Sequence, residues 1–165
     1  METDKIKKGE RLDRWAADKY RICMHRIDHH ETYNNMQIVQ GAIYTCEFGE
    51  NIGYEQGRPI TENRRPALVI SNNAHNRRSA TVVVVPLTTK IKRFAINDRG
   101  VKVPTIRTQY FLYKSRYPFL RDDSVVKVEK IREVDKVRLD ALMGNIMKED
   151  LNNILERLKW LTKIF

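Results

Sequence analysis

The first part of the chain carries apolar residues at the spacing of an α-helix. Between positions 12 and 27 they fall near a 3.6-residue period and form one narrow stripe, which follows Leu12, Trp15, Ala16, Lys19, Ile22, Cys23 and Ile27. The pair Asn34-Asn35 is a suitable end for this helical segment. Because one apolar stripe does not keep an isolated helix stable, we expect the segment to dock on the rest of the protein or on a second copy.

From Gly41 to about Val134 the pattern changes to that of β-strands. The β-branched runs 66–70 and 80–87 suit strands that are buried on both sides. Pro86 indicates that the second run stops, bulges or reaches a sheet edge at that position. Long loops are expected over 49–65 and 89–108. These features predict a small, strongly bent sheet or barrel, with strands over 41–48, 66–70, 80–87, 109–113 and 124–129.

The last part of the chain has a helical pattern again. Asp135 is suited to cap a helix that continues through the apolar residues at 139, 142, 143 and 146. Asp150 is suited to cap a second helix, and its apolar positions between Leu151 and Phe165 form one packing face. The whole pattern predicts an α+β protein, mostly β, in which a helical N-terminal extension (1–38) precedes a domain (39–165) that ends in helices.

The charge of the chain is concentrated in its middle. The chain has 165 residues, enough for one domain with a core, and a formal net charge of +10. Between Arg58 and Arg121 there are fourteen basic residues and two acidic ones, so this segment carries +12 and the remainder carries −2. Such segregation favours a polyanionic partner, with nucleic acid ahead of a basic surface that merely keeps the protein in solution.

Several classes of protein are excluded by what the sequence lacks. The longest apolar run, Val82–Val85, is far shorter than a membrane span, and the acidic N-terminus does not resemble a secretory signal. Two cysteines, Cys23 and Cys46, form neither a disulfide framework nor a metal motif. We therefore expect a cytoplasmic protein that does not contact a membrane.

No cofactor or metal is predicted. The sequence has no P-loop, no Rossmann glycine string and no HExxH motif. His25 and His29 could share one helix face beside His30 and Glu31, but no matching set of ligands follows downstream. An exposed helix end accounts for these histidines better than a metal site does.

An ordered set of short motifs is more informative. It begins with Gly53-Tyr-Glu-Gln-Gly57 and continues with Arg64-Arg65-Pro66-Ala-Leu-Val-Ile-Ser71 and then Asn76. The run Val82-Val-Val-Val-Pro-Leu-Thr88 follows, and the segment from Asp123 to Leu139 contains Glu-Lys-Ile-Arg-Glu-Val-Asp-Lys-Val-Arg-Leu. In order and spacing this set resembles the MazF/PemK family of toxin endoribonucleases, over about residues 40–160.

The resemblance implies a fold, an activity and partners. The fold would be the small SH3-like barrel of the MazF, PemK and CcdB toxins, with helices packed on it and an extra N-terminal helix. The protein would be a homodimer that cuts single-stranded RNA, including mRNA, without a metal, leaving a 2′,3′-cyclic phosphate and a 5′-hydroxyl. A small acidic antitoxin would neutralise it, and promoter DNA would be contacted only through that antitoxin.

The resemblance also assigns site residues. The family's arginine before proline corresponds to Arg65, which would help the 2′-hydroxyl attack the adjacent phosphate. The family's threonine at the strand end corresponds to Thr88, which would form a hydrogen bond with a phosphoryl oxygen. Arginine has a pKa above about 12 and is a poor proton acceptor, so Arg65 is expected mainly to stabilise charge. The residues expected to bind RNA are Tyr54, Glu55, Gln56, Arg64, Asn76, Lys90, Lys92 and Arg93.

Departures from the family pattern leave two other functions open. The loop before Arg65 is longer than usual, and Lys130 and Glu133 replace the late glutamine and threonine of the family. One alternative is an SH3-like module that binds nucleic acid without cutting it, and the other is a gyrase-poisoning toxin on the same fold. The presence of both Arg65 and Thr88 favours the nuclease.

Overall fold

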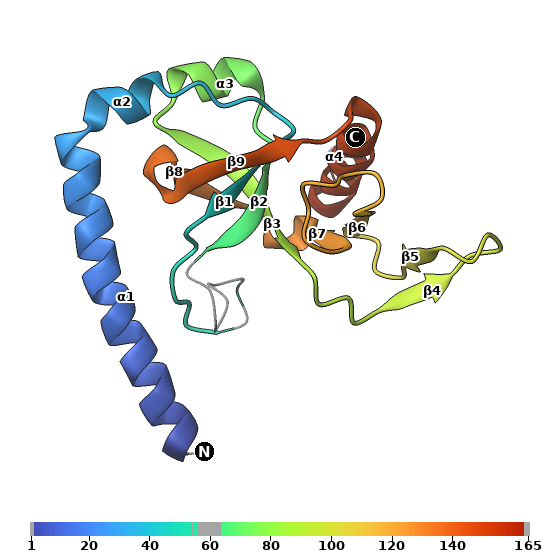
Figure 1. Cartoon of the computed structure of the whole chain (residues 1–165), viewed down its shortest axis with the longest axis horizontal. Coiled ribbons are helices and arrows are strands. Elements are labelled where there is room, and N and C mark those ends of the chain that lie inside the picture. The colour runs from blue at the N-terminus through green and yellow to red at the C-terminus, as the bar shows by residue number, and fades with distance from the viewer. Residues whose placement is uncertain (1, 54, 56–63, 164–165) are drawn as a thin grey trace.

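The computed structural model describes residues 2–53, 55 and 64–163, and its strands form a sheet between N-terminal helices and a C-terminal helix (Figure 1). The helices are α1 (Glu2–Asp28), α2 (His30–Asn35), α3 (Asn73–Arg78) and α4 (Lys148–Thr162), with 3₁₀ turns η1 (Val128–Lys130) and η2 (Lys136–Arg138). The strands are β1 (Ala42–Cys46), β2 (Arg65–Val69), β3 (Thr81–Thr88), β4 (Phe94–Ile96), β5 (Lys102–Pro104), β6 (Gln109–Leu112), β7 (Ser124–Lys127), β8 (Arg132–Asp135) and β9 (Leu139–Asn145). The mostly β, α+β class is confirmed.

β3 is the central strand of the main sheet. The strand order is β6-β7-β3-β2-β1-β9, and β8 also pairs with β3. On one side β3 pairs with β8 from Thr81 to Val84 and with β7 at Leu87 and Thr88. Pro86 lies between these two ladders, so β3 does not stop at Pro86 but changes its pairing partner from β8 to β7. At such a position the missing backbone N–H of proline costs little. Within the described residues β6 and β9 do not pair with each other, so the expected barrel is not closed in this structure.

Both faces of the sheet are buried. Alternate residues of β1, β2 and β3 enter two different apolar clusters, as expected for β-branched strands covered on both sides. Ile43, Leu68 and Val85 pack in the cluster that also contains Ile154 of α4. The other cluster contains their sequence neighbours, including Ala42, Ala67 and Val84.

The prediction of a helix that begins at Asp135 is wrong. The side chain of Asp135 does accept a bond from the backbone N–H of Val137, but it caps only the short turn η2, and the chain then forms β9. β9 pairs with β1 through an irregular register, in which Tyr44 faces Leu142 and Cys46 faces Leu139. These register shifts place apolar residues three apart on a strand, which imitates helical spacing. Only one C-terminal helix is therefore present among the described residues.

The second expected helix is present as α4, but Asp150 does not cap it. The N-cap position belongs to Met147, and Asp150 lies within the first turn, only 4% exposed. Its carboxylate accepts hydrogen bonds from the hydroxyls of Tyr110, at 2.6 Å, and Tyr117, and it pairs with Arg116 at 3.3 Å. Asp150 thus attaches α4 to β6 and to the segment that follows it.

This cluster gives an expected loss of stability in alkali. Burial, followed by the hydrogen bond to Asp150, raises the pKa of Tyr110 to about 12, from about 10 in an unfolded chain. Because the folded-state pKa is the higher one, this contribution to stability is complete below pH about 10 and is lost as the pH rises towards 12. Denaturant unfolding measured across this range should show a shallower decline for Tyr110→Phe than for the wild type. Parallel declines would contradict the assignment.

The N-terminal helix docks on the body, as one of the two expected arrangements, but mainly through polar residues. No residue of α1 is buried, and Leu12 and Ile27 of the apolar stripe are 41% and 59% exposed. Trp15 packs against Gly49, whose added Cβ would lie 2.4 Å from the indole ring. Arg26 pairs with Asp135 at 3.1 Å. The helical segment ends at Asn35, as expected. Among the described helices, none combines the length and the hydropathy of a membrane-spanning segment.

The prediction of a long loop over 89–108 is only partly confirmed. It contains a separate two-stranded hairpin, in which β4 pairs with β5 so that Phe94 faces Pro104 and Ile96 faces Lys102. Figure 1 shows this hairpin extending away from the main sheet, on the side opposite α1. The expected loop over 49–65 falls largely outside the described residues.

Candidate active site

The structure brings Arg65 and Thr88 together on neighbouring strands. β2 and β3 are antiparallel with Ala67 opposite Pro86, and Arg65 and Thr88 each lie two residues beyond this last pair, on the face of Ala67 and Pro86. Directly opposite residues of an antiparallel pair carry their side chains on the same face. The Arg65 guanidinium donates to the main-chain carbonyl of Leu87 at 3.2 Å, and the Thr88 hydroxyl accepts from the backbone N–H of Lys90 at 3.2 Å. A guanidinium and a hydroxyl therefore share one end of the sheet.

A lysine that the sequence analysis missed lies on this same face. β7 pairs with the end of β3, with Val125 opposite Thr88, and alternation along β7 puts Lys127 on the face of Val125. Burial lowers the pKa of Lys127, and the nearby cations Lys130, Arg65 and Lys92 lower it further, while Glu129 opposes them. The face beside Arg65 is thus strongly cationic.

Glu129 is the second residue that was missed. Its carboxylate accepts hydrogen bonds from the Thr108 hydroxyl at 2.9 Å and from the Gln109 side chain at 3.1 Å, and it interacts with the charge of Lys127. The available signal was a lysine and a glutamate at alternate positions of an otherwise apolar strand pattern. Their relation to Thr88 depends on the pairing of β3 with β7, which the sequence does not show.

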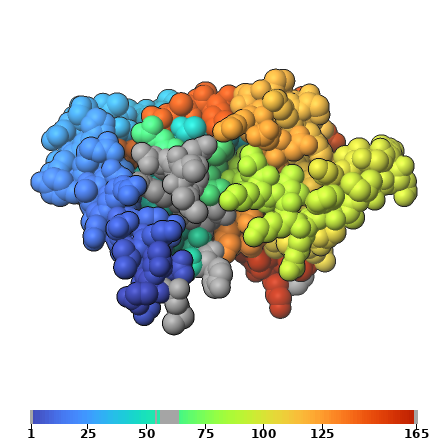
Figure 2. Space-filling view, turned by 60° about the horizontal axis from the view of Figure 1, so that its bottom comes forward, coloured from blue at the N-terminus to red at the C-terminus, as the bar shows by residue number. Residues whose placement is uncertain are grey.

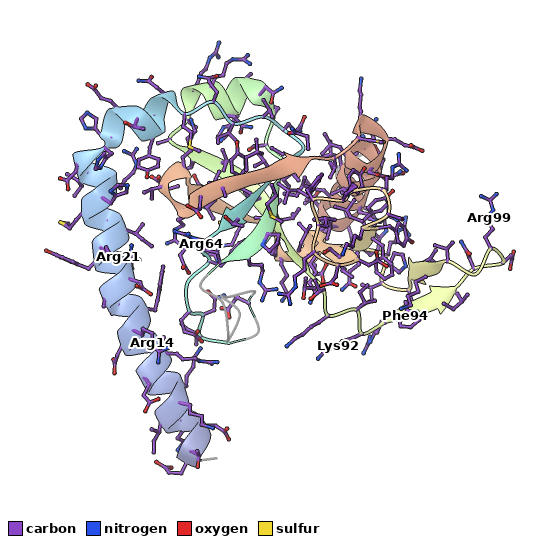
Figure 3. All side chains as sticks on the ribbon, in the orientation of Figure 1. Arg14, Arg21, Arg64, Lys92, Phe94 and Arg99 are labelled. Atoms are coloured by element: carbon purple, nitrogen blue, oxygen red, sulfur yellow. The ribbon has the colours of Figure 1, made fainter. Side chains whose placement is uncertain are left out.

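Arg64 is directed elsewhere. Its guanidinium donates to the Asp140 carboxylate on β9 at 2.6 Å, and both side chains are about half exposed. It lines a cavity of about 420 Å³ between α1 and the body, together with Arg21, His25 and Arg138. Figure 3 shows Arg64 on the side of the sheet that faces α1, and Arg21 on that helix. The structure therefore does not bring Arg64 into the group formed by Arg65, Thr88 and Lys127.

The other residues expected to bind RNA differ in how exposed they are and in which hydrogen bonds they form. Asn76 is fully buried, and its amide exchanges hydrogen bonds with Ser71, at 2.6 and 3.0 Å, which hold the turn before α3. Its expected contact with RNA stays a prediction. Glu55 is exposed, and hydrogen bonds from its own backbone N–H and from that of Gly53 lower the pKa of its carboxyl. Tyr54 and Gln56 lie outside the described residues.

Lys90, Lys92 and Arg93 follow Thr88 closely in the chain, and all three are exposed. Figure 3 shows Lys92 where the chain leaves the main sheet for the β4–β5 hairpin. Of these three, Lys92 lies close enough to Lys127 to lower its pKa, as Arg65 and Lys130 also do, so positive charge gathers beside the end of β3. That arrangement suits a phosphodiester whose negative charge increases during reaction.

Comparisons with known proteins agree with this geometry. A family model described as the PemK-like, MazF-like toxin of type II toxin–antitoxin systems matches residues 39–162. Endoribonuclease EndoA of Bacillus subtilis (strain 168) is 32% identical over 124 residues, which cover 75% of this chain and 93% of that protein. Endoribonuclease MazF of Staphylococcus saprophyticus is 33% identical over 121 residues, or 71% and 87% of the two chains.

Solved structures give the same result. A mycobacterial endoribonuclease in complex with its cognate antitoxin is similar with a TM-score of 0.54 and 26% identity, over 78% of this chain and 97% of that one. MazF from Deinococcus radiodurans, at 22% identity, shares the fold with a TM-score of 0.56, over 78% and 99% of the two chains. The resemblance seen in the sequence is confirmed, the curated relatives are endoribonucleases, and this chain belongs to the PemK-like, MazF-like toxin family of type II toxin–antitoxin systems.

Proposed function

We propose that this protein is the endoribonuclease toxin of its toxin–antitoxin pair and cuts single-stranded RNA without a metal ion. The observation that carries the proposal is the cross-strand placement of Arg65 and Thr88, with Lys127 on the same face of the sheet. The products would be a 2′,3′-cyclic phosphate and a 5′-hydroxyl. The family match and the endoribonuclease relatives support this activity.

In the proposed reaction the RNA supplies its own nucleophile. The 2′-oxygen forms a bond to the adjacent phosphorus while the bond from phosphorus to the 5′-oxygen breaks. The Arg65 guanidinium offers fixed donors to the charge that builds up on the phosphoryl oxygens, and the Thr88 hydroxyl donates to one of them. Each lost donor of this kind typically lowers the rate by about 10²–10³-fold.

Two protons have to move in this reaction. Glu129, whose carboxylate interacts with the charge of Lys127, accepts the proton of the 2′-hydroxyl, and Lys127 gives a proton to the departing 5′-oxygen. The lowered pKa of Lys127 makes it a better proton donor than Arg65, whose charge is permanent. Glu129 then releases its proton to solvent, and solvent restores the proton of Lys127.

Lys127→Met provides the test of this role. Removal of a general acid typically lowers kcat by about 10²–10⁴-fold, and the variant should also lose the decline of rate at alkaline pH that deprotonation of Lys127 causes. A substrate with sulfur in place of the scissile 5′-oxygen has a leaving group that needs no proton, so it should restore cleavage by this variant. Restoration of Thr88→Val to the same extent would show that the sulfur acts independently of Lys127.

We also propose the partners of the protein and its location. The net charge of +12 between Arg58 and Arg121 supports binding of an acidic antitoxin segment that folds on this surface. A mycobacterial structural neighbour is in complex with its cognate antitoxin. We expect a cytoplasmic homodimer that reaches promoter DNA only through the antitoxin.

The finer description of the fold is likewise a proposal. β3 pairs with three strands, β2, β7 and β8, which supports a sheet bent as in an SH3-like barrel. The family match begins at residue 39, which supports a catalytic domain over 39–165 preceded by an extension over 1–38. Limited proteolysis that removes the extension and leaves the domain folded would agree with this division.

The experiment that tests the function is cleavage of a long unstructured RNA in EDTA. We expect discrete cuts whose new 5′ ends carry a hydroxyl and share a short sequence. An RNA that is shifted on a gel but stays intact would overturn the proposal and leave a binding module. Intact RNA together with inhibition of DNA supercoiling by gyrase would leave the gyrase-poisoning alternative.

A further inference from the structure

The segment that follows Thr88 forms a projecting arm. We use the name β4–β5 arm for residues 89–107, which include the hairpin of β4 and β5. The two strands pair only with each other among the described strands, and all three residues of β4 are exposed. Figure 2 shows the arm at one end of a face of the molecule and α1 at the other end. The arm therefore presents a large surface that the core does not use.

The charge of this arm is strongly positive and is not neutralised internally. Its nineteen residues include six basic side chains and one acidic side chain. Within the described part of the chain, Lys90, Lys92, Arg93 and Arg99 form no ion pair with a carboxylate. These charges are thus available to an anionic partner.

One face of the hairpin combines an aromatic ring with a cation. Phe94 and Ile96 alternate onto the same face and are 42% and 56% exposed. Lys102 lies opposite Ile96 on β5, and its ammonium sits 5.1 Å from the centre of the Phe94 ring. An exposed ring among unpaired cations is the combination that binds single-stranded nucleic acid, in which bases stack and phosphates pair with charge.

The base of the arm is attached to the body. The Tyr113 hydroxyl donates to the main-chain carbonyl of Lys102, and the Arg107 guanidinium stacks on Trp160 of α4 at 4.5 Å. A hollow of about 660 Å³ lies between the arm and the body, and it is lined by Thr89, Ile91 and Lys102 of the arm and by Lys114, Asp122 and Asp123 of the body. The arm is therefore held beside the end of β3, where Thr88 lies.

We propose that the β4–β5 arm is a second RNA-binding site, which holds the strand on one side of the cleavage point. A base stacks on Phe94, while Lys92 and Lys102 contact phosphates. The inference rests on the proposed function only in taking single-stranded RNA as the substrate. Continuity with Thr88 favours RNA over other partners, because a strand that crosses the end of β3 reaches Lys92 first and Phe94 next. Figure 3 shows Lys92, Phe94 and Arg99 in this order along the arm.

The test compares two RNAs by fluorescence anisotropy, in the Arg65→Ala background, in which cleavage is expected to be about 10²–10³-fold slower. The short RNA spans only the cleavage sequence, and the long RNA adds about ten nucleotides on each side, within the usual range of such sites. Phe94→Ala should weaken binding of the long RNA about tenfold, and Phe94→Trp should restore it. The double change Lys92→Ala and Lys102→Ala should reduce the salt dependence of log Kd by about 1.4, since each single-strand phosphate contact contributes about 0.7.

The short RNA and one further variant provide the controls. Binding of the short RNA should be unchanged by Phe94→Ala, and Lys148→Ala, which removes a lysine at the start of α4, should affect neither RNA. Equal weakening on both RNAs, or on neither, would overturn the proposal. Loss of the dimer in sedimentation, or weaker binding of an acidic peptide with unchanged RNA affinity, would instead assign the arm to a protein interface. Arm-dependent binding by a wild type that cuts no RNA would support the arm and refute the nuclease.

Discussion

Arg65→Ala is expected to lower kcat for RNA cleavage by about 10²–10³-fold, because it removes the guanidinium that we propose to stabilise charge on the reacting phosphate. The change lies at the first residue of β2, where the side chain is half-buried and bonds to the Leu87 carbonyl. Loss of one such bond at a strand end should cost little stability. The rate is measured in EDTA at saturating enzyme, so that binding does not limit it.

The matched control for this variant is the neighbouring residue. Arg64→Ala removes the same charge from the adjacent position, but Arg64 is paired with Asp140 on β9. An exposed ion pair contributes little, so kcat should stay within about threefold of the wild type. Equal losses in both variants would indicate that the general positive charge of the region matters, not the position of Arg65. An active Arg65→Ala variant would refute the proposed chemistry.

Asp150→Ala is expected to be the most destabilising single change among those discussed. It removes a buried carboxylate that accepts from Tyr110 and Tyr117 and pairs with Arg116. Breaking a buried pair in this way costs about 3 kcal/mol or more, which corresponds to a fall in Tm of about 6–12 °C for a chain of this size. Thermal unfolding followed by circular dichroism measures this shift.

Asp150→Ser separates this role from helix capping. Serine caps a helix about as well as aspartate, so a cap would tolerate the change. A buried acceptor for two tyrosine hydroxyls would not, because serine is too short to reach both. We therefore expect Asp150→Ser to be destabilised nearly as much as Asp150→Ala. A Tm close to the wild-type value would return Asp150 to the capping role that its place in the sequence suggests.

The strands of the core could be recognised from local pattern. The β-branched runs that became β2 and β3 are apolar on both faces, and only a strand buried on both sides needs such a sequence. α1 and α4 were recognisable for the corresponding reason, since each has one apolar stripe at helical spacing. Arg65 and Thr88 lie at the ends of these strong strand signals, so the motifs that contain them were recognisable as well.

The segment after Asp135 was misread because its apolar spacing has two causes. Residues 139, 142 and 143 would share a helix face, but in the structure irregular pairing of β9 with β1 produces the same spacing on a strand. Gly144, a residue that is unfavourable inside a helix, allows a close approach of the Phe119 ring, which would lie 2.5 Å from an added Cβ. No local pattern distinguishes these cases.

The sequence by itself determined the class of fold, the central strands and the uneven charge, because each follows from local periodicity or composition. The pair Arg65 and Thr88 is a prediction that the resemblance to the family motif implies. Only the tertiary structure decided that Lys127 joins this pair, that Arg64 faces Asp140, and that Asp150 is buried under two tyrosines. Those relations depend on strand register and helix docking, which bring together residues far apart in the chain. Strand register and helix docking are determined by the free energy of burial summed over the whole core, which cannot be read from any short segment of the sequence.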